Sequence, residues 1–298
     1  MVERLTPGAI HRPREIVRLH PAGKAVNVAR RPGPDASARV LRCFRLAAGM
    51  PLRRARGRGS APAPAAGSLR RCTSIYDAAA GNLTELYEPG GDPGGDAWDR
   101  FAALVVSGAR AAATREPIVI AGSLPPAVGP EAFAELVAEL ISGDAEVVID
   151  TSGPALAALR GQTPTLVKVN EHEAAELLGV DATSADGVAL SDGVGAAFGG
   201  ASAIVTRGER GAVLSGSGGA LEVSLDAHGS FPVGSGDAFL AGLLSARERG
   251  AGLDEQLRTA VAAGAANAAI LGAGRLDPEA VAGLRDRAEV SALGTPGR

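Results

Sequence analysis

A glycine turn followed by an aspartate is the stretch of this sequence best suited to chemistry. Residues 233–238 read Val-Gly-Ser-Gly-Asp-Ala, an extended lead-in that turns into a helix. Glycines at a helix start let backbone N–H groups approach an anion, and the helix dipole adds positive potential there. A carboxylate beside such an anion hole is explained if it takes a proton from a hydroxyl that attacks a phosphoryl group. Taken alone, an ordinary capped helix after a glycine-rich turn is the simpler explanation.

Two other motifs follow apolar runs. Residues 170–173 read Asn-Glu-His-Glu, with Asn170 and Glu173 on adjacent faces of a first helical turn. A capping box with Asn170 as N-cap explains the same spacing. Residues 206–211 read Thr-Arg-Gly-Glu-Arg-Gly, for which a hairpin turn is the alternative.

Lysine is rare in this chain. Lys24 lies in the small-residue stretch 23–29, Gly-Lys-Ala-Val-Asn-Val-Ala, and Lys168 ends the apolar run before Asn170. These are the two lysines of the sequence, and both fall inside motifs. A lone exposed lysine is usually just solvated, but this placement favours a role in binding.

Strands and helices alternate along most of the chain. The expected strands are 72–77, 83–87, 118–121, 146–150, 165–169, 203–206 and 212–214, and the expected helices are 98–113, 131–141, 154–159, 171–178, 236–249, 254–271 and 277–286. Alternation with short connections predicts a mostly parallel sheet covered by helices on both faces. Ligands of such sheets bind at the carboxyl ends of the strands, and the polar motifs lie at these ends.

Composition excludes several classes of protein. The 298 residues are 46% hydrophobic but contain no apolar run of 18, so we expect no membrane span. No secretory signal is visible, and Cys43 and Cys72 are too few for a disulfide framework. These features predict a reduced, cytoplasmic protein.

The segment 31–69 departs from the rest of the chain. It is mostly Arg, Ala, Pro, Gly and Ser, and we expect it to be irregular because it offers little apolar surface to bury. Residues 1–71 hold sixteen basic residues against three acidic ones. Such a segment could bind nucleic acid, but aromatic residues are sparse in it and no recognition motif appears. We hypothesise instead a frame-shifted stretch of a GC-rich gene, which translation of the other reading frames would test.

Together these motifs resemble those of the ribokinase-like (PfkB) sugar kinases, closest to the branch of 1-phosphofructokinase and tagatose-6-phosphate kinase. The resemblance covers roughly residues 3–30 and 70–290. It implies a three-layer α/β/α kinase domain over 1–298, with a small β lid from strands near 8–20 and 72–87. It also implies that Asp237 is the catalytic base and that Gly234, Ser235 and Gly236 form the anion hole.

The resemblance assigns ATP and Mg²⁺ to the middle of the chain. Asn170 and Glu173 match the family's N-x-x-E element, from which Glu173 would reach Mg²⁺ through water. The residues expected to contact the nucleotide are Lys168, Asn170, Glu173, Thr206, Arg207, Gly208, Glu209, Arg210, Gly211 and Asn267, the last beside the adenine.

The acceptor site is expected near the N-terminus. Gly23, Lys24 and Asn27 match the family's first signature, in which the lysine would pair with the phosphate on the sugar and the asparagine would bind its hydroxyls. Arg70 aligns with an arginine that grips the sugar phosphate, with Arg71 as the alternative register.

Two parts of the family pattern are not found. The first core strand and its sugar-binding aspartate would precede residue 3, and the segment 31–69 replaces a helix, a strand, a Gly-Gly sugar contact and a further helix. We therefore expect a reduced sugar pocket and an unstable or weakly active chain.

The predicted reaction is phosphorylation of a hexose phosphate by ATP, with fructose 1-phosphate going to fructose 1,6-bisphosphate. The partner is thus a small sugar phosphate rather than nucleic acid or a membrane, and the resemblance implies that a homodimer can form through the lid. Tagatose 6-phosphate, fructose 6-phosphate or another sugar is the alternative acceptor, and a nucleotide-binding remnant with little activity is the alternative to an enzyme.

Overall fold

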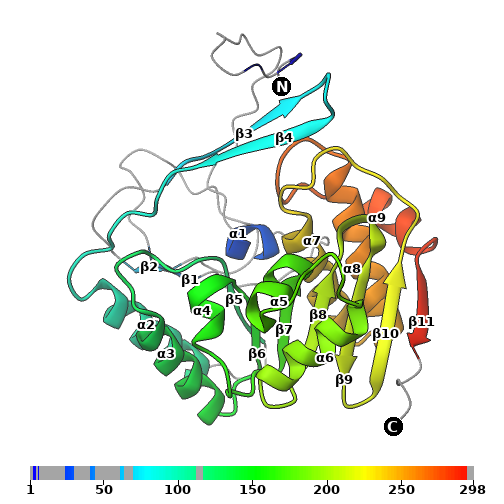
Figure 1. Ribbon diagram of the computed structural model, residues 1–298. Coiled ribbons are helices and arrows are strands. Elements are labelled where there is room, and N and C mark those ends of the chain that lie inside the picture. Colours follow the sequence, from blue (N-terminus) through cyan, green and yellow to red (C-terminus); the bar gives the residue numbers. More distant parts are fainter. Residues whose placement is uncertain are drawn as a thin grey trace.

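A seven-stranded sheet organises the chain, with the strand order β11-β10-β9-β8-β7-β6-β5 (Figure 1). The computed structural model describes residues 3, 4, 6, 24–29, 41–43, 61–63, 70–111 and 117–293. Four strands pair in parallel, and they are β5 (Ile118–Ala121), β6 (Val147–Asp150), β7 (Leu166–Asn170) and β8 (Ser202–Thr206). All four residues of β6 are buried, as its apolar run predicts for a strand covered on both faces.

The carboxyl ends of the parallel strands meet at one edge of the sheet. Ala121 lies opposite Asp150, and Asn170 lies opposite Thr206 in the strand register. The polar residues that follow β6, β7 and β8 therefore converge there. This confirms the predicted α/β class of fold.

Three antiparallel strands extend the sheet beyond β8, namely β9 (Ala212–Gly216), β10 (Gly219–Ser224) and β11 (Glu289–Leu293). The strand β9 was expected, but β10 and β11 were not. Both are partly exposed, so their sequences lack the apolar run that marks a buried strand.

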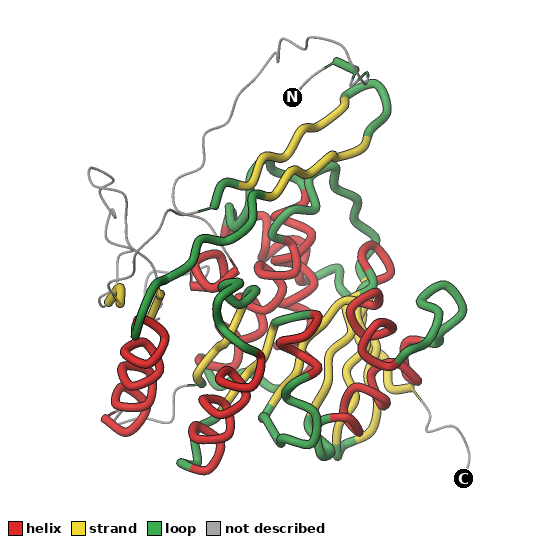
Figure 2. Tube along the Cα trace, turned by 60° about the vertical axis from the view of Figure 1, so that its left-hand side comes forward, coloured by secondary structure: helices red, strands yellow, loops and turns green. Residues whose placement is uncertain are grey.

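Helices cover both faces of the sheet, as Figures 1 and 2 show. The first layer holds α2 (Ala97–Ala111), α3 (Pro130–Ser142), α4 (Gly153–Ala157), α5 (Glu171–Leu178) and α6 (Gly187–Ala197), and the second holds α1 (Lys24–Ala29), α7 (Ser235–Glu248), α8 (Leu253–Ala268) and α9 (Pro278–Arg285). Alternate strand residues face the two layers. Val147 and Ile149 pack with the first layer, and Val148 packs with the second. The helix α6 was not expected, because its three alanines and three glycines interrupt the apolar periodicity.

A two-stranded hairpin stands above the carboxyl edge of the sheet. It consists of β3 (Cys72–Asp77) and β4 (Asn82–Tyr87), which pair antiparallel as expected for a hairpin over residues 72–87. The ring of Tyr76 lies 5.0 Å from that of Phe231, so the hairpin contacts the loop before α7. The other expected lid strand, near 8–20, lies outside the described residues.

Two short strands interrupt the segment that was expected to be irregular. They are β1 (Leu41–Cys43) and β2 (Ala61–Ala63), which pair in parallel and contact α2. The remainder of 31–69 lies outside the described residues. Among the helices that the structure describes, none combines the length and apolar character needed to cross a bilayer.

Candidate active site

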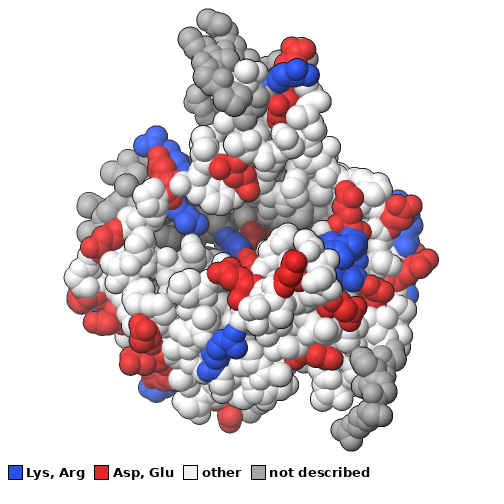
Figure 3. Space-filling model, viewed as in Figure 1, with Lys and Arg blue, Asp and Glu red and all other residues white. Residues whose placement is uncertain are grey.

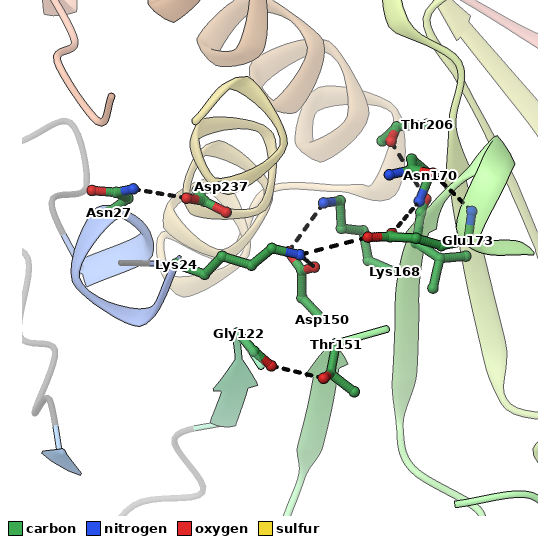
Figure 4. Close-up of polar contacts among 11 residues, drawn as sticks. Lys24, Asn27, Gly122, Asp150, Thr151, Lys168, Asn170, Glu173, Thr206 and Asp237 are labelled. Atoms are coloured by element: carbon green, nitrogen blue, oxygen red, sulfur yellow. Dashed lines mark hydrogen bonds and ion pairs between the residues drawn. The ribbon is translucent and has the colours of Figure 1, made fainter. Parts of the chain in front are cut away.

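The carboxylate of Asp150 lies between two lysine ammonium groups at the end of β6 (Figure 4). Its Oδ1 is 2.9 Å from Lys24 Nζ, and its Oδ2 is 3.0 Å from Lys168 Nζ. The side chain of Asp150 is fully buried, that of Lys168 is 4% exposed and that of Lys24 is 34% exposed. A charge buried this deeply requires partners of opposite sign, and the two lysines of the chain supply them.

The lysines control the ionisation of Asp150. Burial alone would raise the pKa of this carboxyl, but the positive charges of Lys168 and Lys24 outweigh burial and hold the pKa below its usual value. Burial would likewise lower the pKa of Lys24, yet attraction to Asp150 and Glu173 leaves that pKa raised. Both shifts favour the charged forms of Asp150 and Lys24.

Asp237 lies in the first turn of α7 with its side chain directed toward α1. Asn27 donates a hydrogen bond of 2.8 Å from Nδ2 to Asp237 Oδ2. Burial raises the pKa of Asp237; the hydrogen bond from Asn27 acts in the opposite direction, and the negative charge of Asp150 adds to the rise. A buried carboxylate with a raised pKa is a better proton acceptor than an exposed one, which suits a general base.

The turn before α7 has the geometry of an anion hole. Gly234 is the N-cap with φ of 82°, a left-handed conformation that favours glycine. The amides of Gly236 and Asp237 belong to the first turn of the helix, which offers them no intrahelical acceptor. A Cβ on Gly236 would come within 2.8 Å of Lys168 Nζ, so the ammonium group borders these amides. The N-terminus of α7 thus combines N–H donors with a cation.

Asn170 and Glu173 form the capping box that was the alternative explanation of their spacing. Asn170 Oδ1 accepts a hydrogen bond of 2.9 Å from the Glu173 amide, and Glu173 Oε2 accepts one of 2.9 Å from the Asn170 amide. The second oxygen, Oε1, lies 3.9 Å from Lys24 Nζ. The capping box therefore leaves Oε1 of Glu173 directed toward Lys24.

The loop 206–211 closes with a 3₁₀ turn, Gly208–Arg210, in which the Arg207 amide donates to the Gly211 carbonyl. The charged side chains of this loop pair with protein groups: Arg207 with Glu222, Arg210 with Glu171, and Glu209 with His228. A Cβ on Gly211 would lie 2.0 Å from the Val223 carbonyl oxygen, so only glycine fits there. Thr206 Oγ1 donates to the Val169 carbonyl at 3.4 Å. The loop thus presents mainly its backbone.

Asn267, which the resemblance places beside the adenine, lies in the interior of the structure. Its side chain is fully buried in α8, where Nδ2 donates to the Val233 carbonyl at 2.9 Å and to Ser235 Oγ at 3.2 Å. Its Oδ1 accepts from the Gly274 amide at 2.8 Å. These contacts tie Asn267 to the anion-hole loop.

Two of the remaining candidates for the acceptor site lie by the hairpin. Arg70 is exposed at its base, with the guanidinium 6.0 Å from the centre of the Tyr87 ring. Its alternative, Arg71, pairs with Glu88 at 3.5 Å. Gly23 lies outside the described residues. Figure 3 shows the surface hollowed beneath the hairpin, with acidic and basic side chains in the hollow.

Sequence reasoning missed Asp150. It was expected only as the last residue of a strand, because a single aspartate has no motif around it. The usable signal was its position, since an aspartate that ends a buried parallel strand lies at the ligand edge of the sheet. Thr151 marks the same edge, where its Oγ1 donates to the Gly122 carbonyl at 2.7 Å.

Comparisons with known proteins agree with this geometry. The profile of the pfkB family carbohydrate kinases matches residues 94–280. A 1-phosphofructokinase of Rhodobacter capsulatus is 33% identical over 76% of this chain and 72% of its own length. A 1-phosphofructokinase of Xanthomonas campestris is 32% identical over 98% of this chain and 93% of its own. A crystal structure of phosphofructokinase-2 from Escherichia coli superposes with a TM-score of 0.77 at 21% identity, covering 96% of this chain and 93% of that one.

Replacing Asp150 by Asn should destabilise the fold by about 3–5 kcal/mol, because the ammonium group of Lys168 would remain buried without its counter-charge. The lowered pKa of Asp150 means that its contribution is complete above pH 3.8 and is lost as the pH falls through the native pKa. Urea unfolding of both chains should therefore show a full difference at pH 7 that closes only in strong acid.

Glu139→Gln is the matched control, since it breaks an exposed pair with Arg110 at 3.0 Å. That substitution should cost less than about 1 kcal/mol. Equal losses for the two variants would contradict a structural role for the buried cluster.

Proposed function

The chain belongs to the pfkB family of carbohydrate kinases, and from this premise we propose that it phosphorylates fructose 1-phosphate with ATP to form fructose 1,6-bisphosphate. The family transfers a phosphoryl group to an alcohol, and the relatives that share most of this chain bear the name 1-phosphofructokinase. The observation that carries the proposal is the buried carboxylate of Asp237 beside the anion hole at the start of α7.

The proposed chemistry is an in-line displacement. The acceptor hydroxyl gives its proton to Asp237 while its oxygen bonds to the γ-phosphorus of ATP, and the bond from that phosphorus to the β,γ-bridging oxygen breaks. The amides of Gly236 and Asp237 and the ammonium group of Lys168 stabilise negative charge on the phosphoryl oxygens. ADP leaves with the bridging oxygen.

The residues of the nucleotide side fit this reaction. The loop 206–211 offers backbone to the nucleoside, because its arginines are held in ion pairs with the protein. Among the described residues, no cluster of three or more acidic, histidine or cysteine side chains forms a metal cage. Mg²⁺ commonly binds through one or two carboxylates together with phosphates and water, and Oε1 of Glu173 fits such a site. When bound, Mg²⁺ would neutralise charge on the phosphates of ATP.

The residues of the acceptor side adjoin the base. Asn27 donates to Asp237 through Nδ2, and its buried Oδ1 has no partner among the described residues, which leaves an acceptor for a sugar hydroxyl. Lys24 lies between Asp150 and Glu173, on the nucleotide side of Asp237. We therefore propose that Lys24 contacts the phosphoryl group in transfer as well as the acceptor. The role of Arg70 and Gly23 at the sugar phosphate remains a proposal from the sequence.

A substrate panel tests the acceptor. Fructose 1-phosphate, tagatose 6-phosphate, fructose 6-phosphate and unphosphorylated fructose should be compared in a coupled ADP assay. We expect the highest kcat/KM for fructose 1-phosphate, at a weak absolute rate because the segment 31–69 lacks the family's sugar contacts. A D-tagatose-1-phosphate kinase of Klebsiella oxytoca is 31% identical over 31% of this chain, which makes another ketose phosphate the alternative acceptor. A higher kcat/KM for a ketose phosphate other than fructose 1-phosphate would overturn the proposed substrate. Nucleotide binding without turnover of any sugar would instead indicate a nucleotide-binding remnant with little activity.

Asp237→Asn should lower kcat by about 10²–10⁴-fold while ADP still binds, because only the proton acceptor is removed. In the wild-type chain, activity should fall as the pH drops through the raised pKa of Asp237, above the ordinary 3.8. The residual activity of the variant should lack this acid limb.

Stability distinguishes the loss of a base from misfolding. A carboxyl whose pKa is raised by folding stabilises the fold at low pH and loses that contribution as the pH rises through the native pKa. Asp237→Asn should therefore be no less stable than the wild type at pH 7. An unchanged kcat would contradict the role of Asp237 as base.

We further propose a homodimer formed through the hairpin. Leu86 and Tyr87 on β4 are 58% and 54% exposed, an apolar surface that a second copy could cover. The phosphofructokinase-2 of Escherichia coli has a tetrameric inhibited form, which supports assembly in this fold. Sedimentation velocity should show a dimer, and Leu86→Lys should dissociate it; a monomeric wild type would overturn the proposal.

The proposed location is the cytoplasm, where ATP and sugar phosphates are available together.

A further inference from the structure

The loop that forms the anion hole is held against the C-terminal end of α8. The Phe231 amide donates to the Ala268 carbonyl at 3.0 Å, and a Cβ on Gly229 would come within 2.5 Å of Ala268. A Cβ on Gly234 would lie 2.7 Å from that of Ala273. Backbone packing at three points therefore fixes the course of residues 229–234.

Asn267 completes this contact from inside the protein. Its Nδ2 group donates to Val233 before the turn and to Ser235 after it, so one amide spans the N-cap position. The side chain is fully buried, and its amide atoms are used in hydrogen bonds within the protein. A residue that recognised adenine would need an exposed polar edge, which Asn267 does not have.

The other end of the Asn267 amide reaches toward the catalytic base. Oδ1 accepts from the Gly274 amide, and a Cβ on Gly274 would lie 3.0 Å from Asn27 Oδ1. Asn27 in turn donates to Asp237. Asn267 thus positions the backbone of Gly274, against which Asn27, the hydrogen-bond partner of Asp237, packs.

We propose that Asn267 is a positioning residue for phosphoryl transfer, which orients both the anion-hole amides and the base. The inference rests on the proposed function, because it assigns Asn267 to the anion hole and base of that reaction. Catalysis by preorganised donors is sensitive to small displacements, and a misplacement of about 1 Å can cost roughly 100-fold in rate. A nucleotide contact would act on binding instead.

Asn267→Asp separates the effect of the Nδ2 donor from that of the Oδ1 acceptor. The variant keeps an acceptor for the Gly274 amide but replaces the donor to Val233 and Ser235 with an oxygen that faces the Val233 carbonyl. We expect kcat to fall about 100-fold, while the dissociation constant of ADP changes by less than about threefold. A variant with normal kcat and weakened ADP binding would overturn the inference and restore the adenine contact.

Thr259→Val is the matched control on the same helix. Thr259 is also buried in α8, but its hydroxyl has no hydrogen-bond partner among the described residues. Its removal should leave kcat and ADP affinity unchanged. A loss in this variant equal to that of Asn267→Asp would show that any change in α8 disturbs the site, and would contradict a specific role for Asn267.

Amide hydrogen exchange tests the inference independently of turnover. Asn267→Asp should increase deuterium uptake in residues 231–238 but not in residues 273–276. Asn267→Ala places no charge in the core and removes both the Nδ2 donor and the Oδ1 acceptor, so it should increase uptake in both segments. Unchanged uptake in 231–238 in the folded variants would overturn the positioning role. This holds even if the wild type phosphorylates no sugar, a result that would reject the proposed function alone.

Discussion

The buried carboxylate of Asp150 is the interaction on which the rest of the site depends. Removing a charge from water costs several kcal/mol, and in this protein two lysines from distant parts of the chain offset that cost. Lys24 comes from α1 and Lys168 from β7, so one carboxylate holds the start of the chain against the centre of the sheet. The same arrangement brings Lys168 to Gly236, where its charge borders the anion hole. The ion pairs that hold the fold together and the charges that the proposed reaction would use therefore belong to one network.

Close backbone packing determines the geometry that this network serves. Glycines allow the loop before α7 to approach the end of α8 more closely than any side chain would permit. Asn267 then fastens the loop from within, by hydrogen bonds on both sides of the N-cap. The amides at the start of α7 are thereby held in place by the protein itself, which is the condition that the proposed electrostatic catalysis requires.

In the proposed reaction, the proton acceptor must be a carboxylate with a raised pKa, whereas stabilising the phosphoryl charge requires a cation. The fold keeps these two groups apart around the first turn of α7. Asp237 points toward Asn27, away from water, where burial raises its pKa. Lys168 stays close to Asp150, whose charge it needs. In the proposed reaction, Asp237 is thus ready to take a proton while the ammonium group of Lys168 is available to the phosphoryl group. The hairpin formed by β3 and β4 stands above both.

Local sequence determined the elements and motifs of this protein, because these depend on neighbours in the chain. The apolar run of β6, the capping box at Asn170 and the glycine turn before α7 were all readable from residue order. Tertiary structure decided which side chains meet. Asp150 has no motif, and the packing of α8 against residues 229–235 gives Asn267 hydrogen bonds to Val233 and Ser235 that no spacing in the sequence indicates. Such partners lie far apart in sequence, and burial and hydrogen bonding, which assign their roles, exist only once the chain has folded.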